Sequence, residues 1–163
     1  MAACADSVSL ALTKGLSAPC GALLAGPAEF VERARRHRWM LGGNWKQGGV
    51  VAAACLTALT SMPERLRLDH DHARRLAEGL NSIEGLAVDV DEVVTNILYM
   101  ATDSGFDAVR WCELVARAGV TVGPFGSDGR CRWVTHPGLT TSDIDRAIHV
   151  AASAAQRTRT CTD

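Results

Sequence analysis

The sequence has 163 residues, of which 47% are hydrophobic and 21% are charged, and its formal net charge is −1. This length allows one domain or a small two-lobed unit. A net charge so close to zero argues against a general nucleic-acid or membrane-surface binder, and no apolar stretch reaches the ~18 residues that a transmembrane helix needs.

The start of the chain carries no recognisable targeting segment. Residues 1–6 lack a basic start and a long apolar stretch, and Asp6 argues against a mitochondrial transit sequence. The six cysteines are scattered and form no C-x-x-C pair; they stand at positions 4, 20, 55, 112, 131 and 161. We therefore expect reduced, buried thiols in a cytosolic protein.

The segment that ends in Lys14 carries the most informative pattern. Residues 6–14 read as an alternating strand in which Val8, Leu10, Leu12 and Lys14 share one face. A primary amine at the tip of a buried strand can lose its proton and condense with an aldehyde. The alternative is a strand-ending lysine whose amine reaches water. Taken alone, these residues favour the solvated lysine.

A second strand and two helices are predicted to follow. The strand spans 20–25, and Pro27 then opens a helix that stops at Gly42-Gly43. The residues expected to face inward are Phe30, Val31, Ala34 and Leu41. The next helix, 47–60, is poor in charge and rich in alanine, so we expect it to be buried or packed against another subunit.

The remainder of the chain alternates helices and short strands. An amphipathic helix is predicted from 64 to 81, with its apolar residues at Leu66, Ala73, Leu76, Leu80 and Ile83. The elements expected after it are strand 93–100, helix 107–118, strands 120–123 and 130–135, and a last helix that begins with a T-x-x-D signal at Thr140 and Asp143. This order suggests a small open sheet with helices on one face.

The domain organisation follows from these elements. Two strands and two helices cannot complete a sheet core, so residues 1–62 read as the end of a larger layer whose beginning is absent. Residues 63–156 read as a connecting helix and a small α/β domain, and 157–163 as a frayed tail.

Several motifs then follow one another in a familiar order and spacing. They lie at 6–9, 13–21, 33–36, 40–43, 69–70, 73–80, 95–97 and 132–136. Together they resemble the C-terminal half of low-specificity L-threonine aldolases, which are β-eliminating lyases that depend on pyridoxal 5'-phosphate. The resemblance implies an α/β fold: the end of the large domain of aspartate-aminotransferase-like enzymes plus their small C-terminal domain.

The resemblance also implies roles for three residues. Lys14 matches the lysine that links covalently to pyridoxal phosphate, which reverses the reading from its pattern alone. Arg132 matches the arginine that holds the substrate α-carboxylate, and a planar guanidinium suits this bidentate grip. Lys46 lies where the family usually has an arginine near the cofactor. A lysine keeps the positive charge of the arginine but lacks the planar guanidinium that can form two parallel hydrogen bonds. The implied reaction is retro-aldol cleavage of L-threonine or L-allo-threonine to glycine and acetaldehyde.

The resemblance implies missing parts as well. In the family, the phosphate-binding glycine turn, the histidine stacked on the ring and the aspartate paired with the ring nitrogen precede the lysine, and this chain contains none of these segments. We therefore interpret the chain as a truncated member. Two hypotheses stay open: an aldehyde lyase that works as a homo-oligomer, and a catalytically silent remnant that associates with a full-length paralogue.

Other candidate sites are weaker. Asp69-His70-Asp71-His72 could suggest a metal site, but helical residues two apart point away from each other, so we interpret this run as a solvated helix face. His136 closes a strand and reads as structural, with a supporting role near the site as the alternative. We predict no metal, no nucleic-acid partner and no membrane contact.

Overall fold

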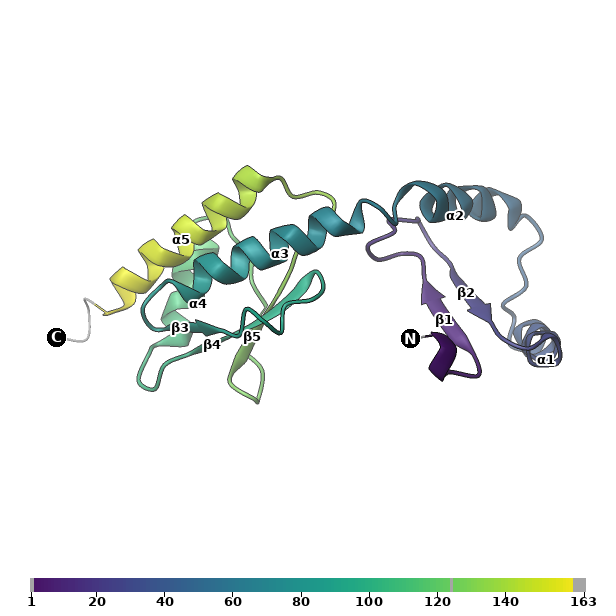
Figure 1. Cartoon of the computed structure of the whole chain (residues 1–163), viewed down its shortest axis with the longest axis horizontal. Helices are drawn as coiled ribbons and strands as arrows, with labels where there is room; N and C mark the ends of the chain where they lie inside the picture. The colour runs from purple at the N-terminus through teal and green to yellow at the C-terminus, as the bar shows by residue number, and fades with distance from the viewer. Residues whose placement is uncertain (1, 124, 160–163) are drawn as a thin grey trace. The chain divides into compact units, whose positions relative to one another are not determined.

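The computed structural model describes residues 2–123 and 125–159 of the chain. The chain divides into two compact units, Met1–Arg65 and Leu66–Asp163, which are described separately here (Figure 1). Within the described ranges, no helix is both long enough and apolar enough to cross a membrane.

The first unit contains an antiparallel strand pair. After a short helical turn, Ala2–Cys4, strand β1 (Val8–Ala11) pairs with β2 (Ala22–Ala25). Every residue of both strands is exposed. β1 ends at Ala11 because Leu12 turns inward and is buried. The predictions that Lys14 ends a buried strand and shares a face with Val8 are therefore wrong.

Two helices complete this unit. α1 (Ala28–Met40) has no buried residue, and Leu41, which was expected to face inward, is 85% exposed. α2 (Gly49–Ser61) buries only Cys55 and Ala58. The expectation that α2 is buried is wrong within this chain, because a two-stranded sheet is too small to cover it. Its packing against another subunit stays a prediction.

The second unit is built on a three-stranded antiparallel sheet in the order β3-β4-β5. β3 (Leu86–Val88) was not predicted, and β4 (Ile97–Thr102) begins four residues later than expected. β5 spans Arg130–Val134, as the sequence indicates. Residues 120–123, expected to form a strand, pair with no strand in the described part of the chain.

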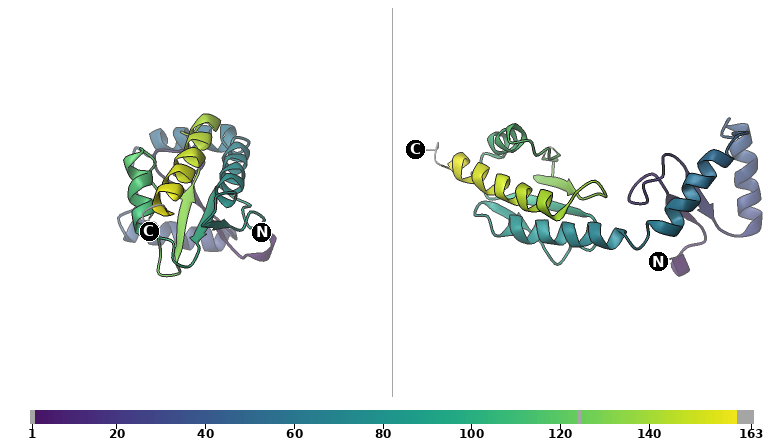
Figure 2. Two further views of the ribbon diagram at one scale, coloured as in Figure 1. Left: turned by 90° about the vertical axis from the view of Figure 1, so that its left-hand side faces the viewer. Right: turned by 90° about the horizontal axis from the view of Figure 1, so that it is seen from above.

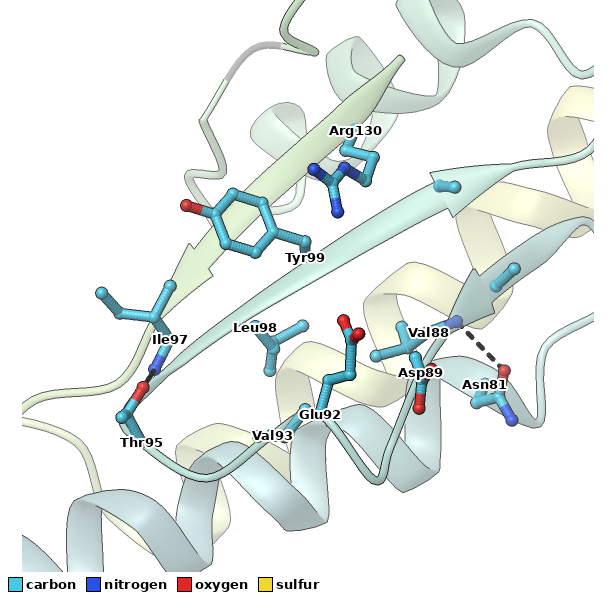
Figure 3. A pocket seen from close by; sticks show the side chains of 12 residues that line it. Asn81, Val88, Asp89, Glu92, Val93, Thr95, Ile97, Leu98, Tyr99 and Arg130 are labelled. Atoms are coloured by element: carbon cyan, nitrogen blue, oxygen red, sulfur yellow. Dashed lines mark hydrogen bonds between the residues drawn. The ribbon is translucent and has the colours of Figure 1, made fainter. Parts of the chain in front are cut away.

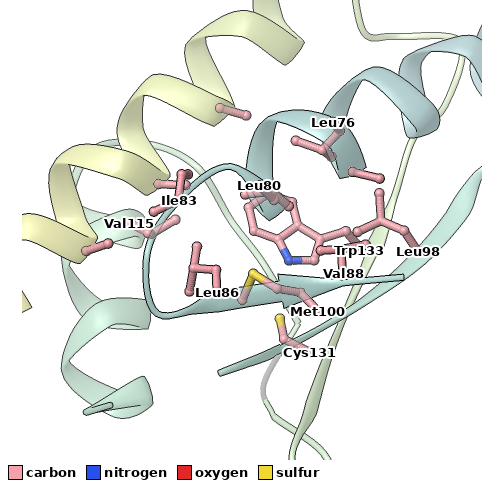
Figure 4. Close-up of a cluster of buried hydrophobic side chains, with 14 of the residues drawn as sticks. Leu76, Leu80, Ile83, Leu86, Val88, Leu98, Met100, Val115, Cys131 and Trp133 are labelled. Atoms are coloured by element: carbon pink, nitrogen blue, oxygen red, sulfur yellow. The ribbon is translucent and has the colours of Figure 1, made fainter. Parts of the chain in front are cut away.

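Three helices cover one face of this sheet: α3 (Leu66–Asn81), α4 (Ala108–Arg117) and α5 (Thr141–Arg159). Figure 2 shows α3 and α5 lying alongside each other over the strands. The core between the helices and the sheet is apolar, and it includes Leu76, Leu80, Leu98, Met100 and Trp133 (Figure 4). The opposite face of the sheet is open, so the prediction of helices on one face is confirmed.

Both later helices start at side-chain caps. The Asp107 carboxylate accepts a hydrogen bond of 2.9 Å from the Arg110 main-chain N–H at the start of α4. At the start of α5, the main-chain N–H of Thr140 donates to Asp143 at 2.9 Å and that of Asp143 donates to Thr140 Oγ1 at 3.3 Å. The predicted start signal is confirmed.

The end of α5 corrects the expected tail. The helix continues through Arg159, and Thr158 is buried and donates a hydrogen bond to the Ala154 carbonyl at 2.8 Å. Residues 157–159 are therefore helical rather than frayed. Residues 160–163 lie outside the described residues.

Candidate active site

Lys14 lies in the loop that joins β1 to β2, residues 12–21. Main-chain hydrogen bonds close this loop: Leu12 N–H donates to the Gly21 carbonyl at 3.1 Å and Ala18 N–H donates to the Leu12 carbonyl at 2.9 Å. A tight turn places Ser17 N–H 2.8 Å from the Lys14 carbonyl. The backbone on both sides of the lysine is therefore fixed.

The loop combines a buried underside with an exposed lysine. Leu12, Leu16 and Ala18 are buried and anchor the loop, whereas Lys14 is exposed. Ser17 has a φ of 58°, a left-handed conformation that costs a non-glycine residue of order 1 kcal/mol and that clusters at functional sites. The loop thus presents a primary amine on a rigid, locally strained backbone.

Lys46 belongs to the same unit but to another connection. It is exposed and stands in the turn before α2. The chain reaches it from the end of α1, where Gly43 N–H donates to the Arg38 carbonyl at 2.8 Å. The neighbouring Trp45 is 60% exposed. Lys46 is therefore an accessible cation at the surface of the first unit.

Arg132 stands on β5 in the second unit, on the open face of the sheet. It is exposed, while its neighbours Cys131 and Trp133 point into the core. Tyr99 of β4 is its direct cross-strand partner. The strand pairing thus fixes the backbone position of Arg132, and its side chain is exposed.

Two residues next to Arg132, Arg130 and Tyr99, were not predicted from the sequence. The guanidinium carbon of Arg130 lies 5.1 Å from the centre of the Tyr99 ring, a cation–π distance, and Arg130 Nε is 2.9 Å from Asp128. Because Arg130 and Arg132 are two positions apart on one strand, both stand on the open face. This alternation in β5 was the signal that could have identified Arg130.

An open hollow lies on the same sheet face (Figure 3). Its volume is about 740 Å³, and its polar lining residues include Asp89, Glu92, Tyr99 and Arg130. Figure 3 shows Tyr99 and Arg130 on one side of the hollow and Glu92 and Asp89 on the other. Arg132 is not part of the lining. The hollow therefore borders the Arg132 position without including it.

Three sequence motifs converge just beyond Arg132. The buried Thr135 donates its hydroxyl hydrogen to the Asp69 main-chain carbonyl at 2.6 Å. Its main-chain N–H donates to the Asn96 carbonyl at 2.9 Å, and Asn96 Nδ2 donates to the Thr135 carbonyl at 2.7 Å. Together these bonds fasten the end of the strand that carries Arg132 to α3 and to the start of β4.

The run from Asp69 to His72 is a solvated face only in part, since Asp71 is exposed and His70 is half-buried. Asp69 and His72 are buried, and the His72 ring Nε2 lies at hydrogen-bond distance, 3.2 Å, from Thr141 Oγ1. The prediction is wrong for Asp69 and His72 because Asp69 shares its helix face with Ala73 and Leu76, which pack in the core. Among the described residues, no three His, Cys, Asp or Glu side chains group as a metal site.

His136 has a structural contact. Its exposed ring accepts a hydrogen bond of 3.1 Å at Nδ1 from the Gly138 main-chain N–H. Its carbonyl accepts another, at 3.0 Å, from Leu139. Both bonds support the turn that leads into α5.

The cysteines also differ from expectation. Cys55 and Cys131 are buried, but Cys4 and Cys20 are exposed. Burial raises the pKa of the Cys131 thiol to about 12, and the neighbouring Cys112 adds to the rise. The predicted reduced state agrees with the free thiols at the five cysteines that the structure describes.

Comparison with known sequences identifies relatives. The profile of the beta-eliminating lyase family matches residues 1–103. Low-specificity L-threonine aldolase 1 of Arabidopsis thaliana is 39% identical over 142 residues, covering 86% of this chain and 39% of that relative. The chain spans about two fifths of the length of such curated relatives.

Comparison with solved structures identifies the fold. Serine palmitoyltransferase of Sphingomonas wittichii aligns with a TM-score of 0.72 at 18% identity, covering 97% of this chain and 41% of that chain. Aspartate aminotransferase of Rhizobium meliloti aligns with a TM-score of 0.67 at 20% identity, covering 93% and 42%. The predicted fold class, the end of a large domain followed by a small α/β domain, is confirmed.

Proposed function

Because the chain belongs to the beta-eliminating lyase family, we propose that it contributes Lys14 and Arg132 to a pyridoxal-phosphate-dependent aldehyde lyase. The proposed reaction cleaves L-threonine and L-allo-threonine to glycine and acetaldehyde. The observation that carries the proposal is the Lys14 loop, in which an exposed amine stands on a backbone fixed by hydrogen bonds.

The Lys14 loop fits the aldehyde group of the proposed cofactor. An exposed primary amine is accessible to an aldehyde, and the fixed backbone means that little order must be gained when the covalent bond forms. When bound, pyridoxal phosphate supplies a ring that takes up the electron pair left by the broken Cα–Cβ bond. The role of Lys14 is to hold this group in place.

Lys46 and Arg132 take the two anions of the proposed reaction. Lys46 is an exposed cation that we propose contacts the cofactor phosphate as a point charge. Arg132 would grip the substrate α-carboxylate with both nitrogens of its fork. Lys14 and Lys46 belong to the first unit and Arg132 to the second.

The experiment is a titration with pyridoxal 5'-phosphate followed by absorbance. The chain contains two lysines, Lys14 and Lys46, so each can be the control for the other. We expect a saturable near-visible band that borohydride removes in the unaltered chain. Lys46→Ala should give the same band but saturate at a higher pyridoxal phosphate concentration, because it loses the proposed phosphate contact, and Lys14→Ala should give no such band. An equal band in Lys14→Ala would contradict the proposal.

A specific observation favours a second candidate function, an association module for a homo-oligomer or a full-length paralogue. Apolar side chains of the first unit are exposed, among them Val50 at 77% and Leu56 at 63% on α2. Exposed apolar surface of this kind marks interaction sites. If the titration gives no band at Lys14 while the chain sediments as an oligomer, this second function is the one to pursue. We place the protein in the cytosol in either case.

A further inference from the structure

The thiol of Cys55 lies against the main chain of Cys20, in the loop that carries Lys14. Cys20 lies in this loop, and Cys55 lies 35 positions later, in α2. The Cys55 thiol donates a hydrogen bond of 3.3 Å to the Cys20 carbonyl. A Cβ atom on Gly21 would lie 3.1 Å from the same sulfur. The Cys55 sulfur therefore sits against the peptide bond between residues 20 and 21.

This contact places the Cys55 thiol close to the main chain of Cys20. A carbonyl oxygen lies ~2.4 Å from its own Cα by standard backbone dimensions, so the Cys55 sulfur is at most about 5.7 Å from the Cys20 Cα. A cysteine sulfur lies ~2.8 Å from its own Cα, so the Cα atoms of Cys20 and Cys55 are at most about 8.5 Å apart, and disulfides join cysteines whose Cα atoms are usually ~4.4–6.8 Å apart. A disulfide between them requires both side chains to turn about χ1.

The two thiols differ in exposure, and the difference assigns them separate roles. Cys20 is exposed and can meet a reagent from solution, whereas Cys55 is buried and is covered by the loop itself. An accessible attacking thiol with a second thiol close behind it is the arrangement that resolves a mixed disulfide.

We propose that Cys20 and Cys55 form a redox-sensitive thiol pair that closes into a disulfide in the presence of a small-molecule disulfide such as oxidised glutathione. The Cys20 thiolate attacks one sulfur of the reagent, whose S–S bond breaks and releases one glutathione. The Cys55 thiolate then attacks the Cys20 sulfur and releases the second. Two electrons pass from the cysteine pair to the reagent, and the two thiol protons go to the two released glutathiones.

The disulfide would tie the Lys14 loop to α2. The loop is now held to the helix by a thiol–carbonyl hydrogen bond, and the disulfide would replace it with a covalent link. Formation of the pair does not depend on the proposed role of Lys14, so it can be tested without cofactor or substrate. Reversible pairs of this kind are the form in which disulfides occur in reducing compartments.

The test is peptide mapping after incubation with oxidised glutathione. Trypsin cuts at Lys14, Arg33, Lys46 and Arg65, so residues 15–33 contain Cys20 as their only cysteine and residues 47–65 contain Cys55 as theirs. Free thiols are alkylated first and the digest is analysed without reduction. The matched control variants are Cys20→Ser and Cys55→Ser.

We expect peptide 15–33 linked to peptide 47–65, a loss of two free thiols per chain, and a monomer band on a non-reducing gel. Dithiothreitol should restore both thiols, and neither serine variant should give the linked peptide. Three results would overturn the proposal: both thiols still free, glutathione retained on Cys20, or a linked peptide found only in cross-linked dimers. A normal pyridoxal-phosphate titration alongside any of these would leave the role of Lys14 standing.

Discussion

The hydroxyl of Thr135 donates a 2.6 Å hydrogen bond to the main-chain carbonyl of Asp69. This bond joins the residue just after β5 to the first turns of α3, across 66 positions of sequence. Both residues are buried. A buried carbonyl that loses its donor pays the full cost of desolvation, so this contact fixes the end of the strand that carries Arg132.

Thr135→Val tests the contribution of this bond. Valine keeps the shape of threonine and removes the donor, so we expect the free energy of unfolding of the second unit to fall by about 1–3 kcal/mol. Urea denaturation followed by circular dichroism measures the change. Thr121, which is exposed, gives the matched control in Thr121→Val, for which we expect less than about 0.5 kcal/mol. Equal effects of the two variants would contradict this account.

Gly79 tests the packing of α3 on α5. An alanine Cβ there would lie 2.7 Å from Cγ1 and 2.9 Å from Cγ2 of Ile148, and a β-branched side chain cannot turn away easily. Helix propensity alone would make Gly79→Ala stabilising by about 1 kcal/mol. We expect instead a loss of about 1–3 kcal/mol in urea denaturation, because of overpacking.

Removing the clash should reverse the sign of this effect. In an Ile148→Ala background, Gly79→Ala should be neutral or stabilising, which a double-mutant cycle measures directly. A cost of Gly79→Ala that is the same in both backgrounds would mean that Ile148 is not the obstacle.

Trp111 tests a buried hydrogen bond between two helices. Its indole Nε1–H donates to the Ala151 carbonyl at 3.1 Å, and the side chain is fully buried. Trp111→Phe removes this donor and some volume, so we expect a loss of about 1–3 kcal/mol in thermal or urea unfolding. Trp45 is 60% exposed, and Trp45→Phe should change stability by less than about 0.5 kcal/mol.

Cys131 gives the second unit a pH dependence on the alkaline side. Its pKa is raised by burial to about 12, whereas an unfolded thiol titrates near ~8.5. Between these values the unfolded chain loses the proton and the folded chain keeps it, so the free energy of unfolding falls as pH rises. Below pH ~8.5 the full contribution is present.

The measurement compares the chain with Cys131→Ala in urea denaturation at pH 8 and pH 10, under reducing conditions. The difference in stability between the two proteins should shrink by roughly 2 kcal/mol over this interval. Other groups that titrate there are common to both proteins and cancel. A difference that stays constant would show that the Cys131 thiol ionises equally in the folded and unfolded chain.

The sequence predicted the second unit better than the first. Periodicity located α3 and its core residues Leu76 and Leu80, because that helix packs its apolar face within the chain. The prediction that Leu10 and Leu41 face inward was wrong. It rested on the assumption that apolar residues are buried, and both residues are exposed in the first unit. Alternation also extended β1 through Lys14, although the sheet ends at Ala11.

The remaining errors concern contacts that are distant in sequence. β3 has three residues, too few for a periodic pattern, and it is defined by its pairing with β4. Asp69 and His72 looked like solvent-facing polar residues in the sequence. Their partners could not be predicted, because the Asp69 carbonyl is bonded by Thr135 and the His72 ring lies against Thr141, each about 70 residues away. Alternation drew attention to Lys14, but its role as the cofactor lysine came from a resemblance to a family. Lys46 and Arg132 came from that resemblance alone, and no pattern of charge or spacing singled them out.

The most direct measurement is mapping of the lysine that borohydride fixes to pyridoxal phosphate. The chain has two lysines, and a modified lysine blocks trypsin. The account predicts a pyridoxyl group on Lys14, found in a peptide of residues 1–33, with residues 39–46 released unmodified. A label on Lys46, in a peptide of residues 39–65, or a label divided equally between the two lysines would contradict the assignment of Lys14 as the cofactor lysine.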